Sequence, residues 1–108
     1  MKIKLFQISP EEDVNNTLFM NYEWTMSHGG VREGSYELVF DGEVNAKELG
    51  DLYCIFNTAH PDGYKGRSMS PSDVVWIEGR GYFFCDSFGF VQLKKFKGEK
   101  CPWRSFDG

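Results

Sequence analysis

Alternating apolar and polar residues predict a domain built mainly on a β-sheet. Residues 2–8 begin with this alternation and then stay apolar, as in a strand. Residues 36–44 alternate again, with a bulge or turn expected at Gly42. Residues 73–77 and 82–86 then form an expected hairpin around a glycine-containing turn, and residues 88–94 continue in extended form.

One segment, residues 46–57, has the spacing of an amphipathic helix. Asn45 is a favourable N-cap, Glu48 would complete a capping box, and Asn57 with Pro61 would end the helix. Lys47, Glu48 and Asp51 would then share the polar face. We expect the apolar face to be buried through Leu49, Leu52, Tyr53 and Phe56.

The remaining segments are less regular. Ser9 and Pro10 predict the start of a short helix. Residues 17–30 alternate like a strand but end in His28-Gly29-Gly30, which is typical of a helix exit, so both alternatives stay open and helix is favoured. Residues 60–71 form a loop rich in Gly, Pro and Ser. We therefore predict one α+β domain over residues 1–108, with a small, mostly antiparallel sheet or partly closed barrel and one main helix.

The charge is distributed unevenly along the chain. The net charge is −4, yet residues 1–93 carry −7 and residues 94–108 carry +3. The acidic body disfavours binding to a phosphate backbone, because such binding depends on cations. A basic tail over residues 95–108 is the part suited to an anionic partner.

Nothing in the composition indicates secretion or a membrane. The N-terminus lacks a signal-like apolar stretch, and no apolar run approaches the length of a spanning helix. Cys54, Cys85 and Cys101 are odd in number and form no CxxC pair, so we expect reduced thiols in the core of a cytoplasmic protein.

Short stretches between residues 36 and 94 share the order and spacing of a known family of domains. The matching residues are Phe40 to Val44, Leu49, Leu52-Tyr53, Phe56-Asn57, His60-Pro61, Gly66 to Val75 and Tyr82 to Phe90, with a weaker match over Phe19 to Tyr22. In these residues the chain resembles the YodL-like family of small domains found in bacteria and mobile genetic elements, with Pro71 as one departure that should stiffen its loop. The resemblance implies an accessory or anti-defence role through protein contacts, and no catalytic residues or cofactor.

Candidate catalytic and metal-binding residues are sparse. Cys85 has no neighbouring group in sequence that would lower its pKa, so a nucleophile with His60 as base is disfavoured. His28 and His60 are 32 residues apart and lack metal-ligand spacing. Arg67, beside several serines, suits a phosphate or carboxylate, although serines also order loops through their own backbone.

These observations favour a non-enzymatic interaction module that binds a host or defence protein. Tyr64, Arg67 and Met69 lie in the 60–72 loop without core periodicity, and these residue types are common at interface centres. We predict that they form the contact centre, with Asp62 at its rim. The alternatives are a nucleic-acid-binding domain that uses Arg67 and the basic tail, and a cryptic enzyme that uses the serine-rich loop or Cys85.

Overall fold

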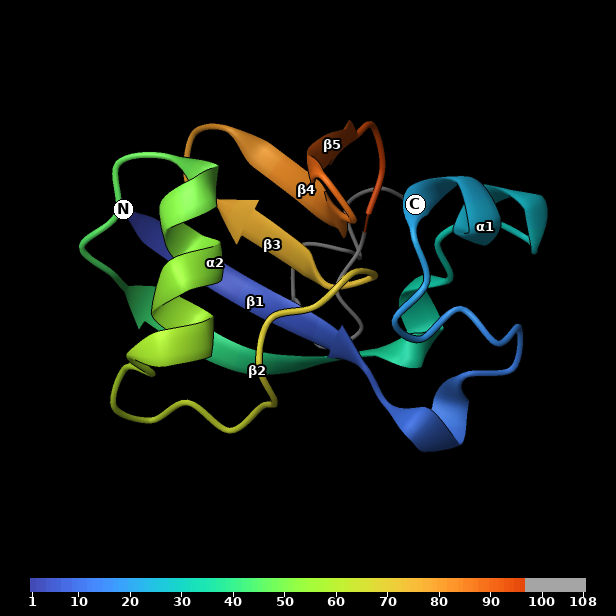
Figure 1. Cartoon of the computed structure of the whole chain (residues 1–108), viewed down its shortest axis with the longest axis horizontal. Helices are drawn as coiled ribbons and strands as arrows, with labels where there is room; N and C mark the ends of the chain where they lie inside the picture. The colour runs from blue at the N-terminus through green and yellow to red at the C-terminus, as the bar shows by residue number, and fades with distance from the viewer. Residues whose placement is uncertain (97–108) are drawn as a thin grey trace.

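The computed structural model describes residues 1–96, which form an open five-stranded antiparallel sheet with one main helix (Figure 1). The strand order is β2-β1-β3-β4-β5. The α+β prediction is confirmed, and the sheet is open rather than closed into a barrel. The elements are β1 (Lys2–Ile8), η1 (Pro10–Glu12), α1 (Tyr22–Ser27), η2 (Glu33–Ser35), β2 (Tyr36–Glu43), α2 (Leu49–Thr58), β3 (Val74–Ile77), β4 (Gly81–Asp86) and β5 (Gly89–Leu93).

The strand β1 lies inside the sheet, between β2 and β3. Its apolar run is buried on both faces: Ile3 and Leu5 pack on one side, Phe6 and Ile8 on the other. A strand covered on both faces reads as a nearly continuous apolar run. This explains why the alternation stops after Lys4.

The strand β2 contains a bulge at Val39, not at Gly42 as the sequence suggested. Leu5 pairs with Phe40 and Phe6 with Leu38, so Val39 is the extra residue. Val39 and Phe40 consequently both face the same core. Gly42 remains in the ladder opposite Ile3.

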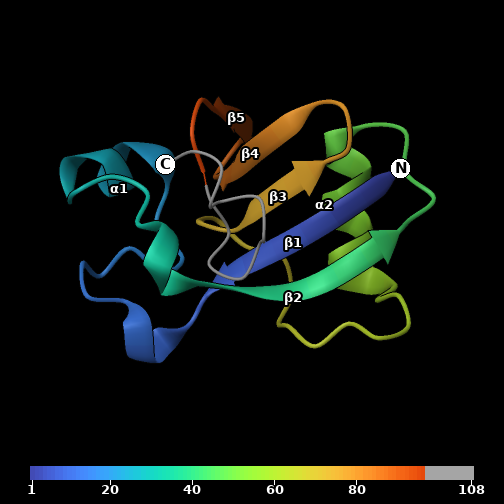
Figure 2. The ribbon, with the colours of Figure 1, turned by 180° about the vertical axis from the view of Figure 1, so that it is seen from behind.

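Two cores lie on the two faces of the sheet. The first lies under α2, where Leu52 and Phe56 are fully buried against β1, β2 and β3. The second is formed by rings on the other face, among them Phe6, Tyr36 and Phe84, and Phe96 contacts them. Viewed from behind, the sheet lies in front of α2, and α1 lies beside one end of the sheet (Figure 2).

The helix α2 begins at Leu49, three residues later than residue 46. Glu48 is the N-cap, and the Asp51 carboxylate accepts hydrogen bonds from the backbone N–H groups of Lys47 and Glu48, which closes a capping box. Burial of Leu52 and Phe56 is confirmed. The prediction for Tyr53 is wrong, because its side chain is 45% exposed; Leu49 is half-buried.

The chain between β1 and β2 is mostly irregular. Residues 17–30 contain only the short helix α1, and the His28-Gly29-Gly30 exit follows it as predicted. The Asn21 side chain caps α1 by accepting a bond from the Trp24 N–H at 2.8 Å. The Pro10 segment is one 3-10 turn, and Ser9 makes no side-chain cap.

The second half of the sheet follows the predicted hairpin. Val74 to Ile77 pairs with Gly81 to Phe84 across a turn, and β4 then pairs with β5. Among the helices of residues 1–96, none combines the length and apolar character needed to cross a bilayer. The predicted role of the basic tail falls mostly on residues 97–108, which lie outside the described residues.

Candidate functional site

The loop between α2 and β3 is held tightly against the sheet. The Lys65 N–H donates to the carbonyl of Val39 in β2, and the Arg67 N–H donates to Oε1 of Gln7 in β1. A side chain at Gly66 would place its Cβ only 2.3 Å from that same oxygen. Only glycine therefore allows the loop to approach β1 this closely.

A buried polar network lies beneath this loop. Gln7 and Asp73 are 1% and 0% exposed, and Gln7 Nε2 donates to Asp73 Oδ2 at 2.9 Å. The same amide nitrogen is 2.9 Å from the Arg67 carbonyl and 3.1 Å from the Tyr64 hydroxyl, so its two hydrogens serve three acceptors. Asp73 Oδ2 also accepts from the Ser70 N–H. These bonds join β1, the loop and the start of β3.

Burial raises the pKa of Asp73 to about 7. The bonds from Gln7 and Ser70 and the nearby Arg67 charge act in the opposite direction but are weaker. Within the described residues, Asp73 Oδ1 and Arg67 Nε are buried without a hydrogen-bond partner. At neutral pH a large share of the molecules therefore hold Asp73 as a neutral carboxylic acid.

Two of the predicted contact residues have structural roles. Met69 is 1% exposed and belongs to the core under α2, so its prediction as a surface contact is wrong. Tyr64 is half-buried, packs its ring against Phe56 and His60, and donates its hydroxyl hydrogen to the Arg67 carbonyl. Burial raises the pKa of Tyr64 to about 12. Asp62 is exposed, and its place at the rim of a contact surface stays a prediction.

Arg67 is placed against a residue that the site prediction did not include. Its Nη2 donates to the Ile8 carbonyl at 3.1 Å, and its guanidinium carbon lies 5.0 Å from the centroid of the Phe19 ring. Phe19 is 51% exposed. Arg67 and Phe19 thus form an aromatic–cation pair at the surface, which we call the Phe19–Arg67 pair.

The backbone of Phe19 is strained. Its φ is +67°, in the left-handed region that bulky residues rarely adopt. The Phe19 N–H donates to Ser72 Oγ at 3.0 Å, and Ser72 is itself buried with a φ of +84°. The Asp13 carboxylate accepts from the N–H groups of Thr17 and Leu18 just before it. Bonds on both sides therefore fix Phe19 in this conformation.

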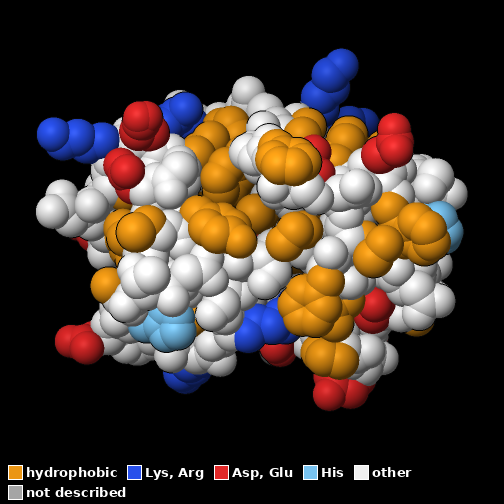
Figure 3. Space-filling model, viewed as in Figure 1, with side chains coloured by type: hydrophobic (Ala, Val, Ile, Leu, Met, Phe, Trp, Pro, Cys, Tyr) orange, Lys and Arg blue, Asp and Glu red, His pale blue; other side chains and the backbone are white. Residues whose placement is uncertain are grey.

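The exposed apolar residues of the domain gather in the same segment. Residues 14–26 contain four of the six large apolar side chains that are exposed within residues 1–96. Figure 3 shows apolar side chains spread over the side of the molecule that carries α1. Trp24 Nε1 donates to the Asn16 carbonyl, and its ring stacks on His28. The four residues are Val14, Phe19, Trp24 and Met26.

The candidate catalytic and metal residues do not assemble into a site. Cys85 is 1% exposed, and burial, aided by Asp73 and Asp86, raises its pKa to about 12. A thiol of this kind is a poor nucleophile. No cluster of three His, Cys, Asp or Glu side chains suited to a metal occurs within residues 1–96. Cys54 is exposed, so its expected place in the core is wrong, and Cys101 lies outside the described residues.

Sequence reasoning missed Phe19 and Gln7. The signal for Gln7 was a polar residue inside an apolar strand, between Phe6 and Ile8. The signal for Phe19 was weaker, because only an aromatic residue after the polar run Asn15-Asn16-Thr17 marked it. Its link to Arg67 spans 48 positions of the chain and had no local signature.

The chain folds into a small α+β domain with an open antiparallel sheet. Its described residues contain no cluster of side chains suited to a metal ion. A family model for the YodL-like domain matches residues 2–96 of the 108. The chain therefore belongs to the YodL-like family, and the match is longer than the 36–94 stretch on which the resemblance rested. No curated protein and no solved structure matches it.

Proposed function

We propose that this domain is a non-enzymatic protein-interaction module whose contact centre is the Phe19–Arg67 pair. Its partner is a host or defence protein, and its role is that of an accessory or anti-defence factor of a mobile element. The partner and role follow from what the family resemblance implies. The contact centre follows from the geometry of Phe19.

The strained, exposed conformation of Phe19 is the observation that carries the proposal. A left-handed φ at a non-glycine residue costs on the order of 1–3 kcal/mol. Folding gains only part of the burial energy that this ring could supply, because 51% of it stays exposed. Glycine would satisfy the same backbone without strain. An aromatic residue kept against this cost is explained by a contact outside the monomer.

The chemistry of the surface suits a protein partner. Aromatic and Arg side chains are enriched among residues that dominate binding energies. Arg67 is already oriented by its bond to Ile8 and by the Phe19 ring, so little side-chain entropy remains to be lost on binding. The net charge of −7 over residues 1–93 opposes binding to the phosphate backbone of a nucleic acid.

The proposal is tested with Phe19→Gly, which removes the ring and also relieves the backbone. We expect its unfolding midpoint in urea to equal or exceed that of the wild type. We also expect the protein partner that wild-type bait captures from host lysate to be lost. Measured with the purified partner, the Kd should rise by about 5- to 30-fold, as for a hot-spot truncation.

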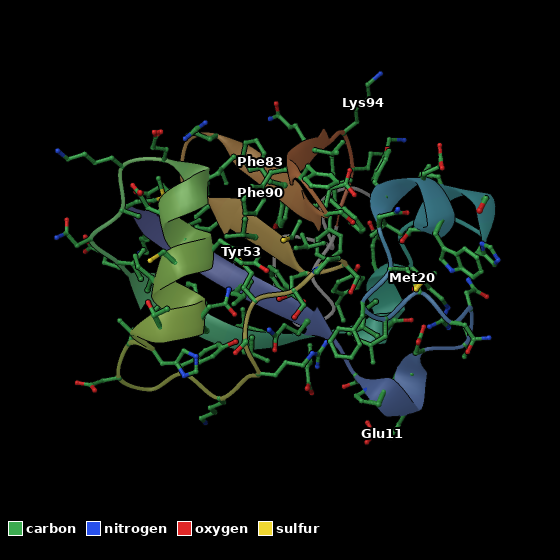
Figure 4. The ribbon with its side chains drawn as sticks, in the orientation of Figure 1. Glu11, Met20, Tyr53, Phe83, Phe90 and Lys94 are labelled. Carbon is green, nitrogen blue, oxygen red and sulfur yellow. The ribbon has the colours of Figure 1, made fainter. Side chains whose placement is uncertain are left out.

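Tyr53→Ala is the matched control, because Tyr53 is 45% exposed on α2. In Figure 4 it lies well apart from Met20, the neighbour of Phe19 in the chain. It should bind like the wild type. Equal capture by wild type and Phe19→Gly would refute the Phe19 contact centre. Binding of the domain to single-stranded DNA with a steep salt dependence would instead support the nucleic-acid alternative.

A further inference from the structure

The two edges of the sheet differ in how they are protected. Edge strand β2 carries exposed acidic residues, Glu37, Asp41 and Glu43, and the bulge at Val39. Charges and bulges on an edge strand prevent it from pairing with another chain. Edge strand β5 contains no charged residue, and within residues 1–96 it is paired with β4 alone. The β5 edge therefore lacks the protection that β2 has.

The two ends of β5 carry complementary groups. Before it, β4 ends at Asp86, whose carboxylate accepts hydrogen bonds from the N–H groups of Tyr22 and Ser87. The turn Ser87-Phe88 follows, and the Phe88 side chain is 98% exposed. After it come Lys94 and Lys95, both exposed. Figure 4 shows the Lys94 side chain extending away from the body of the molecule. The strand β5 thus has an exposed aromatic residue, Phe88, at its N-terminal end and two lysines, Lys94 and Lys95, at its C-terminal end.

The spacing of these ends is symmetric about the middle of the strand. Val91 is the central residue of Gly89–Leu93, with Phe88 three residues before it and Lys94 three residues after it. A two-fold axis relates identical surfaces of two copies. If residue i of the first copy contacts residue j of the second, residue j of the first copy also contacts residue i of the second. An antiparallel pair of β5 strands centred on Val91 would place each Phe88 opposite the partner's Lys94.

We propose that the β5 edge binds β5 of a second copy of this chain, antiparallel and centred on Val91. The two sheets join into one through strand addition, in which main-chain hydrogen bonds supply the pairing. The partner's Lys94 lies over the exposed Phe88 ring as a cation–π contact. The partner's Lys95 lies opposite Ser87, the residue that follows Asp86 at the end of β4. A strand from a different protein would need an aromatic residue and a lysine six positions apart to make both end contacts. This chain already has that pair in Phe88 and Lys94.

This pairing accounts for a side chain that the monomer leaves unexplained. Phe88 contributes almost nothing to the monomer core, because 98% of it is exposed. A five-residue strand with one aromatic contact at each end is a small interface, and such interfaces form weak, transient complexes. We therefore expect a reversible dimer that appears as the concentration rises.

Sedimentation velocity of the full chain from about 1 μM to about 1 mM covers the range expected of a weak dimer. The wild type should shift from the monomer mass towards twice that mass. Phe88→Ala should raise the dimer Kd about tenfold or more without changing the circular dichroism of the monomer. Val14→Ala, at an exposed apolar residue in the segment between β1 and β2, should leave the Kd within about twofold of the wild type.

A charge exchange tests the geometry directly. Lys94→Glu with Lys95→Glu makes the cationic end acidic, and Ser87→Lys with Phe88→Lys makes the turn basic. Each double variant should stay monomeric alone, because like charges then meet across the axis. An equal mixture of the two should form a heterodimer, because each end again meets its opposite.

Three results would overturn the proposal. If the wild type remains monomeric at the highest concentration, the β5 edge does not bind a second copy, and a strand of a different protein becomes the candidate. A dimer whose Kd is unchanged by Phe88→Ala and by the lysine reversals uses another surface. A mixture that stays monomeric rejects the antiparallel arrangement. None of these results bears on the Phe19–Arg67 pair, so the two proposals fail separately.

Discussion

At the scale of single residues, Gly66 provides the sharpest test of how closely the loop approaches β1. Gly66→Ala should destabilise the domain by about 1–3 kcal/mol, because a Cβ would lie 2.3 Å from Gln7 Oε1 and displace a buried hydrogen-bonding group. Gly50→Ala is the control, because a Cβ there meets open space on α2 and alanine favours helix. Urea unfolding measures both. Equal stability of Gly66→Ala and wild type would mean that the loop is not held against Gln7.

The same contact between the loop and Gln7 explains part of what the sequence did not predict. Gln7 is polar and buried because Arg67 and Asp73 supply its hydrogen-bond partners. Met69 lies in an irregular loop without periodicity, yet it is buried in the core under α2. Long-range contacts decided the burial of Gln7 and Met69, and no local pattern records them.

The cysteines provide a second test at the residue scale. Native protein should react with a thiol reagent at the exposed Cys54 and not at Cys85, because burial keeps Cys85 inaccessible and raises its pKa to about 12. Peptide mapping by mass spectrometry reads out each position, and labelling in urea shows that Cys85 reacts once exposed. Rapid labelling of Cys85 in native protein would revive the enzyme alternative.

At the scale of elements, hydrophobic patterning predicted the strands and the main helix well but not their ends. The chain offers two overlapping capping boxes, Asn45 with Glu48 and Glu48 with Asp51. The second forms, because the Asp51 carboxylate captures the N–H groups of Lys47 and Glu48. Local sequence rules favour the first box, because Asn is a preferred N-cap residue and Glu is not. The structure uses the second, so N-cap preference did not decide where α2 begins.

The orientation of α2 predicts a large difference between two neighbouring substitutions. Leu52→Ala should cost about 2–5 kcal/mol, because it empties a fully buried position over the sheet. Tyr53→Ala should cost less than about 1 kcal/mol, because its side chain is 45% exposed and alanine is a good helix former. Urea unfolding of both variants measures the difference. Similar costs at both positions would mean that α2 is rotated from the orientation described here.

At the scale of the whole molecule, the sequence predicted the α+β class but not the strand order. Placing β1 between β2 and β3 requires the chain to cross from β2 through α2 and the 60–72 loop before it enters β3. That crossing brings Arg67 onto residue 19 and Asp73 onto Gln7. Both the surface pair and the buried network are thus products of topology, which residue patterns along the chain do not specify.

Because Asp73 lies where β1, β3 and the loop meet, its ionisation bears on the stability of the whole domain. Its folded pKa of about 7 lies above the ordinary value of 3.8, so the native state binds the proton more tightly than the unfolded chain does. The protonated Asp73 carboxyl therefore contributes its full stabilisation to the folded domain below about pH 4, and this contribution is lost as the pH rises towards about 7. One pKa unit corresponds to about 1.4 kcal/mol, which bounds the total loss at about 4 kcal/mol.

The predicted quantity is the difference in the free energy of unfolding between a variant and the wild type, because the contributions of all other titrating groups cancel in it. The free energy of unfolding of Asp73→Asn minus that of the wild type should increase from pH 4.5 to pH 8, because the amide stays neutral while the carboxyl becomes a buried charge. Urea unfolding at a series of pH values measures it. Asp62→Asn, at an exposed position on the same loop, is measured in parallel as the matched control. A difference for Asp73→Asn that decreases with pH would show that the Asp73 carboxylate is stabilised as an anion beside Arg67.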